Sequence, residues 1–119
     1  ALLPVYMKYF YKDEALFANT KIVTSVYGQS FDGNLDMELM NKVSFDGIPA
    51  EAIKDLETPN YENIIKASVL HSDAVIVASE ALSPSLTKFI ESSKKPFLPF
   101  ASKDKFAEAY TDFYKKMLL

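Results

Sequence analysis

The sequence predicts an α/β domain in which helices cover both faces of a parallel sheet. Three short runs have the character of strands, and each is followed by a segment whose apolar residues recur at helical spacing. Because parallel neighbours need a crossover connection, this alternation predicts a parallel sheet. Three strands are fewer than the roughly four to six of a complete doubly wound domain, so the sheet is expected to be part of a larger one.

The first predicted helix begins near Ala1 and has Pro4 in its first turn, where the missing N–H donor does no harm. Four of its apolar residues recur at helical spacing: Leu3, Tyr6, Met7 and Phe10. β-Branched residues then predict a strand at Ile22–Val26, and Asp32–Asn34 has the chemistry of a turn. The chain opens without a methionine or a polar cap, so we expect that it was cut from a longer protein.

Three helices are predicted between the first strand and the second. The segment "LDMELMNKVSFDG" ends its helix at Gly47 and has one apolar face, made of Leu35, Leu39, Met40 and Val43. The short helix "PAEAIKDL" begins at Pro49 and turns Ile53 and Leu56 inward. The third helix is capped by Asn60, and its predicted buried side consists of Ile64, Ile65, Ala67, Val69 and Leu70.

The second half of the chain continues the alternation. The run "DAVIVAS" (73–79) is almost entirely apolar, which is typical of a strand covered on both faces. Ser83 is predicted to cap the next helix, with Pro84 at its first position. The run "KKPFLPF" (94–100) predicts a short strand away from the sheet centre, because proline cannot donate to a ladder. A last helix carries a stripe for core packing: Phe106, Tyr110, Phe113 and Met117.

Composition excludes several classes of function. The 119 residues carry a net charge of −3, which predicts no nucleic-acid partner and no anionic membrane, and no apolar run approaches the ~20 residues of a membrane span. There is no cysteine, and His71 is the single histidine, so we expect neither a metal site nor catalysis by a thiol or a histidine pair. All thirteen basic residues are lysines, so no guanidinium can hold a phosphate in two places. We expect a cytoplasmic protein without a cofactor.

The strand ends predict where a ligand cleft would lie, because ligands of open α/β sheets bind beyond the carboxyl ends of the strands. The rule selects Tyr27, Gly28, Gln29 and Ser30 after the first strand, Ser79 and Glu80 after the second, and Pro99–Phe100 after the third. The first two groups are our candidates for a substrate cleft. The glycines lack the spacing of a phosphate-binding loop. The alternative is a polar connection that only reverses the chain, and no residue is assigned a catalytic role.

Two segments carry a family resemblance. The stretch "VTSVYGQSFDG" (23–33) resembles the pattern "VFTVHNLAYQG", with Val26, Phe31 and Gly33 at matching places. The stretch "IIKASVLHSDAVIVASEALSPSL" resembles "lKAGlxYADxVxTVSPxYAxE" through Lys66, Ala67, Asp73, Val75 and Ser79. Both patterns are those of the bacterial glycogen and starch synthases, glycosyltransferase family 5. The resemblance covers roughly residues 1–100, and the chain is similar above all to short, one-domain members of Bacteroidetes-type bacteria.

The resemblance implies both a fold and an activity. It implies a partial Rossmann-like three-layer αβα domain with a parallel sheet, in which residues 1–119 form one unit, the C-terminal portion of the N-terminal domain of a GT-B glycosyltransferase. The family transfers glucose from ADP-glucose to an α-1,4-glucan. The implied partners are therefore ADP-glucose and α-glucan, bound through the full-length parent, because the remainder of the domain or a second domain is needed to complete the site. This fragment alone is expected to be inactive.

The chain departs from the family at two strand ends, and these departures keep other hypotheses open. Tyr27–Gly28 stands where the family has histidine–asparagine, and Ser79–Glu80 where it has serine–proline. A second hypothesis is therefore a catalytically degenerate α-glucan- or nucleotide-binding module of the same descent. A third, a flavodoxin-like regulatory domain, is disfavoured because a receiver needs an acidic cluster at its strand ends, and only Glu80 is so placed.

Overall fold

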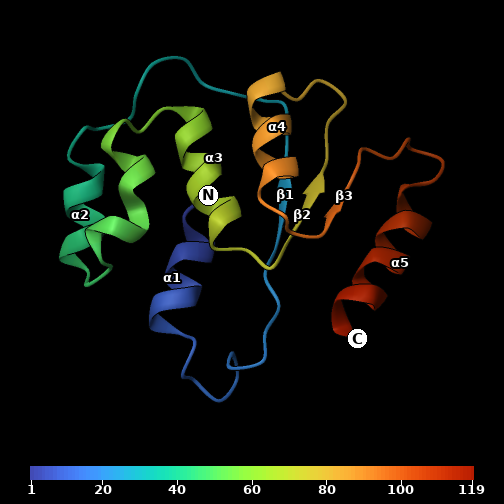
Figure 1. Cartoon of the computed structure of the whole chain (residues 1–119), viewed down its shortest axis with the longest axis horizontal. Helices are drawn as coiled ribbons and strands as arrows, with labels where there is room; N and C mark the ends of the chain where they lie inside the picture. The colour runs from blue at the N-terminus through green and yellow to red at the C-terminus, as the bar shows by residue number, and fades with distance from the viewer.

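The computed structural model describes residues 1–119 and has the predicted order of elements (Figure 1). In chain order these are α1 (Leu3–Phe10), β1 (Val23–Val26), α2 (Leu39–Phe45), the 3₁₀ helix η1 (Ala50–Glu57), α3 (Tyr61–Leu70), β2 (Ala74–Val77), α4 (Pro84–Ser92), β3 (Phe97–Leu98) and α5 (Phe106–Leu118). None of the helices combines the length and the hydrophobicity that a membrane span requires.

The three strands form one parallel sheet in the order β1-β2-β3. Val23 of β1 pairs with Ala74 of β2, and Val75 of β2 pairs with Phe97 of β3. β2 is thus the central strand, which explains its continuous apolar sequence. β3 has only two residues and lies at the sheet edge, as its prolines predicted. The parallel α/β fold predicted from the sequence is confirmed.

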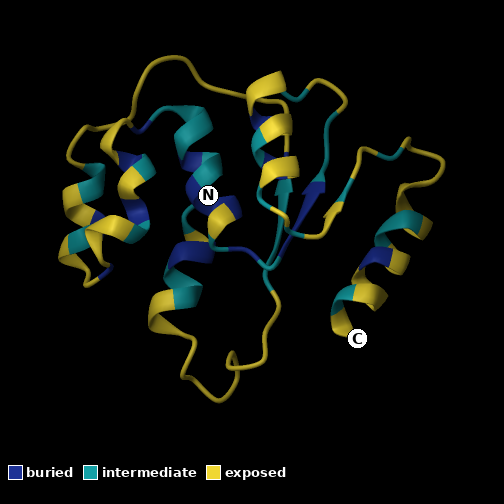
Figure 2. Cartoon of the chain, in the orientation of Figure 1, coloured by how far each residue is buried: buried dark blue, intermediate teal, exposed yellow.

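Helices cover both faces of this sheet (Figure 1). On one face Val26 and Val75 pack against α3 and α4, and on the other Ala74 and Ile76 pack against Phe113 of α5. Successive residues of a strand point to opposite faces, so β2 supplies side chains to both of these clusters. Figure 2 accordingly shows β2 in the colour of buried residues. The molecule therefore has three layers, with the sheet in the middle and α5 as the single helix on one of its faces.

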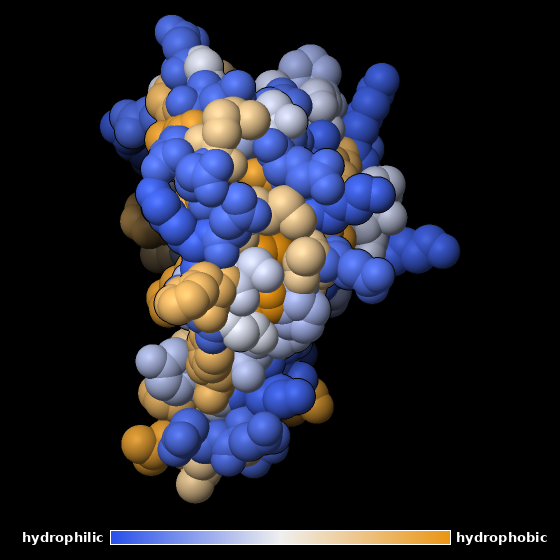
Figure 3. Space-filling view, turned by 90° about the vertical axis from the view of Figure 1, so that its left-hand side faces the viewer, coloured by the Kyte–Doolittle hydropathy of each residue, from blue (hydrophilic) through white to orange (hydrophobic).

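The largest buried cluster lies beside the sheet, among α1, α2, η1 and α3, at the left of Figure 1. It consists of Val5, Val43, Ile48, Ile53, Leu56, Ile64 and Ala67. Figure 3 looks at this side from outside, where hydrophilic side chains cover much of the surface and hydrophobic ones lie between them. This cluster anchors α3, whose first turn belongs to the site described below.

The helix predicted to include Leu35 begins instead at Leu39. The Leu35 N–H donates to the Pro59 carbonyl at 3.0 Å, which ties this residue to a distant segment. The Asp36 carboxylate then accepts the Glu38 N–H at 3.0 Å, a local turn that competes with helix formation. Leu35 is 46% exposed, so its predicted place on the apolar face of this helix is wrong.

Two further details differ from expectation. The helix predicted at "PAEAIKDL" is a 3₁₀ helix with a break at Ile53, where φ is −122°. Ile53 and Leu56 are nevertheless both fully buried, as predicted. Leu70 was predicted to be buried but is 46% exposed. It lies one helical turn beyond Lys66 and shares the outer face of α3.

Candidate functional site

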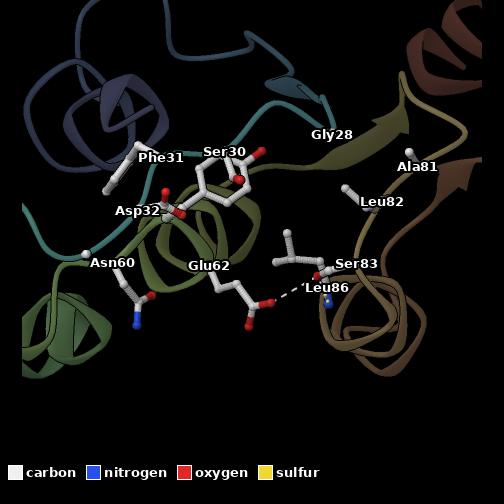
Figure 4. A pocket seen from close by; sticks show the side chains of 12 residues that line it. Gly28, Ser30, Phe31, Asp32, Asn60, Glu62, Ala81, Leu82, Ser83 and Leu86 are labelled. Atoms are coloured by element: carbon white, nitrogen blue, oxygen red, sulfur yellow. Dashed lines mark hydrogen bonds between the residues drawn. The ribbon is translucent and has the colours of Figure 1, made fainter.

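A cleft of about 410 Å³ lies beyond the carboxyl ends of β1 and β2 (Figure 4). The loop after β1, the first turn of α3 and the segment that enters α4 enclose it. Twelve residues line it: Gly28, Ser30, Phe31, Asp32, Gly33, Asn60, Tyr61, Glu62, Ala81, Leu82, Ser83 and Leu86. This is the sheet edge at which ligands of open α/β folds bind.

Two glycines shape the loop after β1. A Cβ atom added to Gly28 would lie 2.6 Å from the Ser79 Oγ atom and 3.0 Å from the Ala81 carbonyl oxygen, so a larger residue would require the Ser79 side chain to rotate and the Ala81 carbonyl to shift slightly. Gly33 has a φ of +73°, a conformation that side chains with a Cβ rarely adopt. The loop can therefore pass close to the end of β2 and then turn back along the cleft.

An aromatic pair forms one wall of the cleft. The rings of Phe31 and Tyr61 meet edge to face, with their centroids 5.8 Å apart. The Tyr61 hydroxyl donates a hydrogen bond to the Tyr27 carbonyl oxygen, which fixes its ring to the loop after β1. Burial raises the pKa of Tyr61 above its ordinary value, so the hydroxyl stays protonated at neutral pH.

Two helices begin at the cleft, and each has the side-chain cap that the sequence predicted. The Asn60 side chain accepts the Asn63 N–H at 2.9 Å at the start of α3, and the Ser83 hydroxyl accepts the Leu86 N–H at 3.3 Å at the start of α4. Ser83 also donates its hydroxyl hydrogen to the Glu62 carboxylate at 3.0 Å, drawn as a dashed line in Figure 4. This bond joins the first turns of the two helices.

The charged side chains that line the cleft are both acidic, those of Asp32 and Glu62. Around them stand the neutral hydrogen-bonding groups of Ser30, Asn60 and Ser83. The chain has no group of three or more histidine, cysteine or acidic residues placed to hold a metal ion. The cleft thus offers hydrogen-bond acceptors and hydroxyls beside aromatic rings, a combination that suits a ligand rich in hydroxyl groups.

The structure brings part of the predicted set together. Gly28 and Ser30 line the cleft, and Ser79 packs behind Gly28, where its Oγ accepts the Ala81 N–H at 3.3 Å. The other three candidates are exposed and lie outside the lining: Tyr27, Gln29 and Glu80. Tyr27 takes part through its backbone carbonyl, as described above. Pro99–Phe100 is also exposed and outside the lining.

Sequence reasoning missed the greater part of the lining, which comes from the rest of the loop after β1 and from two helix starts: Phe31, Asp32, Gly33, Asn60, Tyr61, Glu62, Ala81, Leu82, Ser83 and Leu86. A signal for the helix starts was present. Helices that cover a parallel sheet run antiparallel to its strands, so their first turns lie at the carboxyl edge. The predicted caps Asn60 and Ser83 therefore marked the cleft.

The family described as "Starch synthase catalytic domain" matches residues 1–90. The chain belongs to this family. The matched range contains every residue that lines the cleft of this starch synthase family member. It ends before α5. The fold is consistent with an α/β Rossmann-like fragment of a glycosyltransferase domain.

Individual relatives agree with this assignment. This starch synthase family member is 31% identical to the glycogen synthase of Thermosipho africanus over 80 residues, which are 66% of the chain and 16% of the relative. It is also 31% identical to the glycogen synthase of Thermotoga maritima over 81 residues, again 66% of the chain and 16% of the relative. The chain thus matches only a small part of the length of these relatives. No solved structure matches it.

Proposed function

We propose that the chain is a fragment of a glycogen or starch synthase-type glucosyltransferase that transfers glucose from ADP-glucose to an α-1,4-glucan. In this proposal residues 1–119 are the C-terminal portion of the N-terminal domain of a cytoplasmic enzyme of the GT-B arrangement. The family match over residues 1–90 and the two glycogen synthase relatives support it. The remainder of the parent completes the active site.

The observation that carries the proposal is the pairing of aromatic rings with carboxylates in one cleft at the carboxyl edge of the sheet. A sugar ring has an apolar face of C–H groups and a rim of hydroxyls. Phe31 and Tyr61 offer aromatic surface to the first, and Asp32 and Glu62 offer hydrogen-bond acceptors to the second. In this proposal the cleft therefore holds a glucosyl unit of the glucan.

The diphosphate of ADP-glucose needs positive charge, which this cleft does not offer, since its lining charges are acidic. We therefore assign the diphosphate contacts, and the electrostatic stabilisation of the transition state, to the remainder of the parent. On this division of labour the fragment binds saccharide and does not turn over the donor by itself.

One observation favours the second hypothesis, a catalytically degenerate α-glucan-binding module of the same descent. The resemblance aligns Gly28 with an asparagine of the family, yet a Cβ atom here would lie 2.6 Å from the Ser79 Oγ atom. An asparagine here would require the Ser79 side chain to rotate and the Ala81 carbonyl to shift slightly. The replacement of this asparagine by glycine beside the cleft favours a function without catalysis.

Titration of the ¹⁵N-labelled chain with maltotetraose and with ADP-glucose tests the proposal. We expect maltotetraose to shift backbone signals of the cleft, and Phe31→Ala to weaken its affinity about 3- to 10-fold, as loss of one aromatic contact would. Phe45→Ala is the matched control, because this phenylalanine is 93% exposed and outside the cleft. Absence of any cleft shift with maltotetraose would overturn the proposal.

Glucose transfer separates the two functional hypotheses. The protein isolated from its natural source should extend maltotetraose with ADP-glucose if it is a synthase. Saccharide binding without any transfer would instead support the degenerate module.

A further inference from the structure

We propose that Glu62 determines the charge specificity of the cleft, so that it accepts an uncharged saccharide and rejects the phosphorylated form of the same sugar. This inference rests on the proposed function, because it presumes that the cleft binds a saccharide. It goes further by naming the residue that sets the ligand class.

The Glu62 carboxylate lies between the first turns of α3 and α4. Glu62 lies in the first turn of α3, and its carboxylate accepts the hydroxyl hydrogen of Ser83, the cap of α4, at 3.0 Å. The first turns of helices are where anions are favoured, because N–H groups and the helix dipole point there. The protein thus places its own anion where the phosphate of a ligand would otherwise be most stable.

The surroundings of Glu62 also support this inference. The only other charged side chain in the lining is Asp32, which has the same sign. Lys66 lies one turn further along α3, but its ammonium group stands over the Phe89 ring, 5.6 Å from the ring centroid, and Phe89 is outside the lining. A phosphate that entered the cleft would therefore meet negative charge without a lining cation to offset it.

The hydrogen of the Ser83 hydroxyl is already engaged. The hydroxyl donates to Glu62 and accepts the Leu86 N–H at 3.3 Å, so its single hydrogen is not free for a ligand phosphate. The bond from Ser83 also holds the Glu62 carboxylate in place, and the Leu86 N–H fixes the Ser83 hydroxyl in turn. The negative charge is therefore a fixed feature of the cleft wall.

The test compares maltose with maltose 1-phosphate in the wild-type chain and in the Glu62→Gln variant, by NMR titration at pH 7 and low salt. Glutamine keeps the shape and can still accept from Ser83, but it removes the charge. We expect wild type to bind maltose more tightly than maltose 1-phosphate. In Glu62→Gln this preference should fall about 5- to 20-fold, the effect of one removed charge on a nearby dianion.

Two comparisons make the test specific. Glu91→Gln removes an exposed carboxylate at the other end of α4, outside the cleft, and should leave the preference unchanged. In wild type, 0.5 M NaCl should reduce the preference, because salt screens charge. That measurement needs no variant, and an unchanged preference in high salt would show that the acidic side chains of the lining, Glu62 included, are not its cause.

The possible failures are distinguishable. If maltose itself does not shift cleft signals, the proposed saccharide function is wrong and the inference falls with it. If maltose binds but wild type and Glu62→Gln show the same preference, the cleft remains a saccharide site and the role of Glu62 is wrong. Equal affinity of wild type for both ligands would likewise overturn the inference alone.

Discussion

Gly28 and Ser79 meet across the ends of β1 and β2 so closely that a Cβ atom on residue 28 would lie 2.6 Å from the Ser79 Oγ atom. Real Cβ atoms do not approach another atom so closely, so Ser79 can keep this position only while residue 28 is glycine. The contact joins the two loops that carry the candidate residues of the sequence prediction. Gly28 lines the cleft, and Ser79 lies directly behind it.

Gly28→Ala should lower the free energy of unfolding by about 0.5–1.5 kcal/mol, because the Ser79 side chain must rotate away from the added methyl group and the Ala81 carbonyl must shift slightly. In a Ser79→Ala background the effect should be smaller, because the closest atom is gone and the Ala81 carbonyl at 3.0 Å remains. Urea unfolding of the four proteins of this double-mutant cycle measures the coupling. Equal losses in both backgrounds would show that the contact is not the cause.

Val75→Asp should abolish cooperative unfolding. Val75 is fully buried in the central strand, and a carboxylate there would lose its water without gaining a partner. Leu16→Asp is the matched control, because this leucine is 87% exposed, and its stability should stay within about 0.5 kcal/mol of wild type. Thermal unfolding followed by circular dichroism distinguishes the two. A cooperative transition in Val75→Asp would contradict the central place of β2.

The fold should lose stability in acid, because the stabilising contribution of the ionised Asp73 carboxylate is lost there. Burial by itself raises the pKa of Asp73, but the hydrogen bond from the Ile22 N–H at 2.8 Å and the Lys8 ammonium at 3.0 Å outweigh it and hold the pKa below its ordinary 3.8. A lowered pKa in the folded state contributes stability above pH 3.8, and this contribution is lost as the pH falls through the folded value.

The variant Asp73→Asn checks this pH dependence. Its urea midpoint should lie below that of wild type at pH 7, and the difference should shrink as the pH falls below 3.8. Asp13→Asn, at an exposed position after α1, should follow wild type throughout. A difference between Asp73→Asn and wild type that is constant from pH 7 to pH 3 would rule out the ionised carboxylate as its source.

We expect the Ser83 cap to stabilise α4. Ser83→Ala removes both the acceptor for the Leu86 N–H and the donor to Glu62, and should lower the free energy of unfolding by about 1 kcal/mol. Ser85→Ala changes the same residue type two positions further on, where it is exposed, and should be neutral or slightly stabilising. Chemical denaturation provides both values, and equal effects of the two changes would argue against the cap.

Local sequence signals predicted the elements of this fold well. The caps Asn60 and Ser83 and the helix end at Gly47 depend only on nearby backbone, and all appear in the structure. The late start of α2 was not predictable in this way. It depends on the bond between Leu35 and Pro59, and such a bond exists only once two distant segments are folded together.

The cleft was predictable in place but not in composition. The strand-end rule led to Gly28 and Ser30, because it needs only strands and their direction. The rule did not select Glu62, because the place of this carboxylate at the cleft depends on a bond to the Ser83 hydroxyl, 21 residues later in the chain. Whether the candidate residues contact a substrate remains a prediction.

The sequence separation between neighbouring strands predicts the order in which the sheet assembles. The bond between Ile22 and Asp73, at the start of β1 and β2, spans 51 residues, whereas the Lys95 ammonium reaches the Ser72 carbonyl, beside β2 and β3, across 23. Closing a longer loop slows folding, because the chain loses more entropy before its contacts form. We therefore expect β2, α4 and β3 to come together first and β1 to be added last. A loop that forms one wall of the cleft follows β1, so the site comes into existence only with the final step of folding.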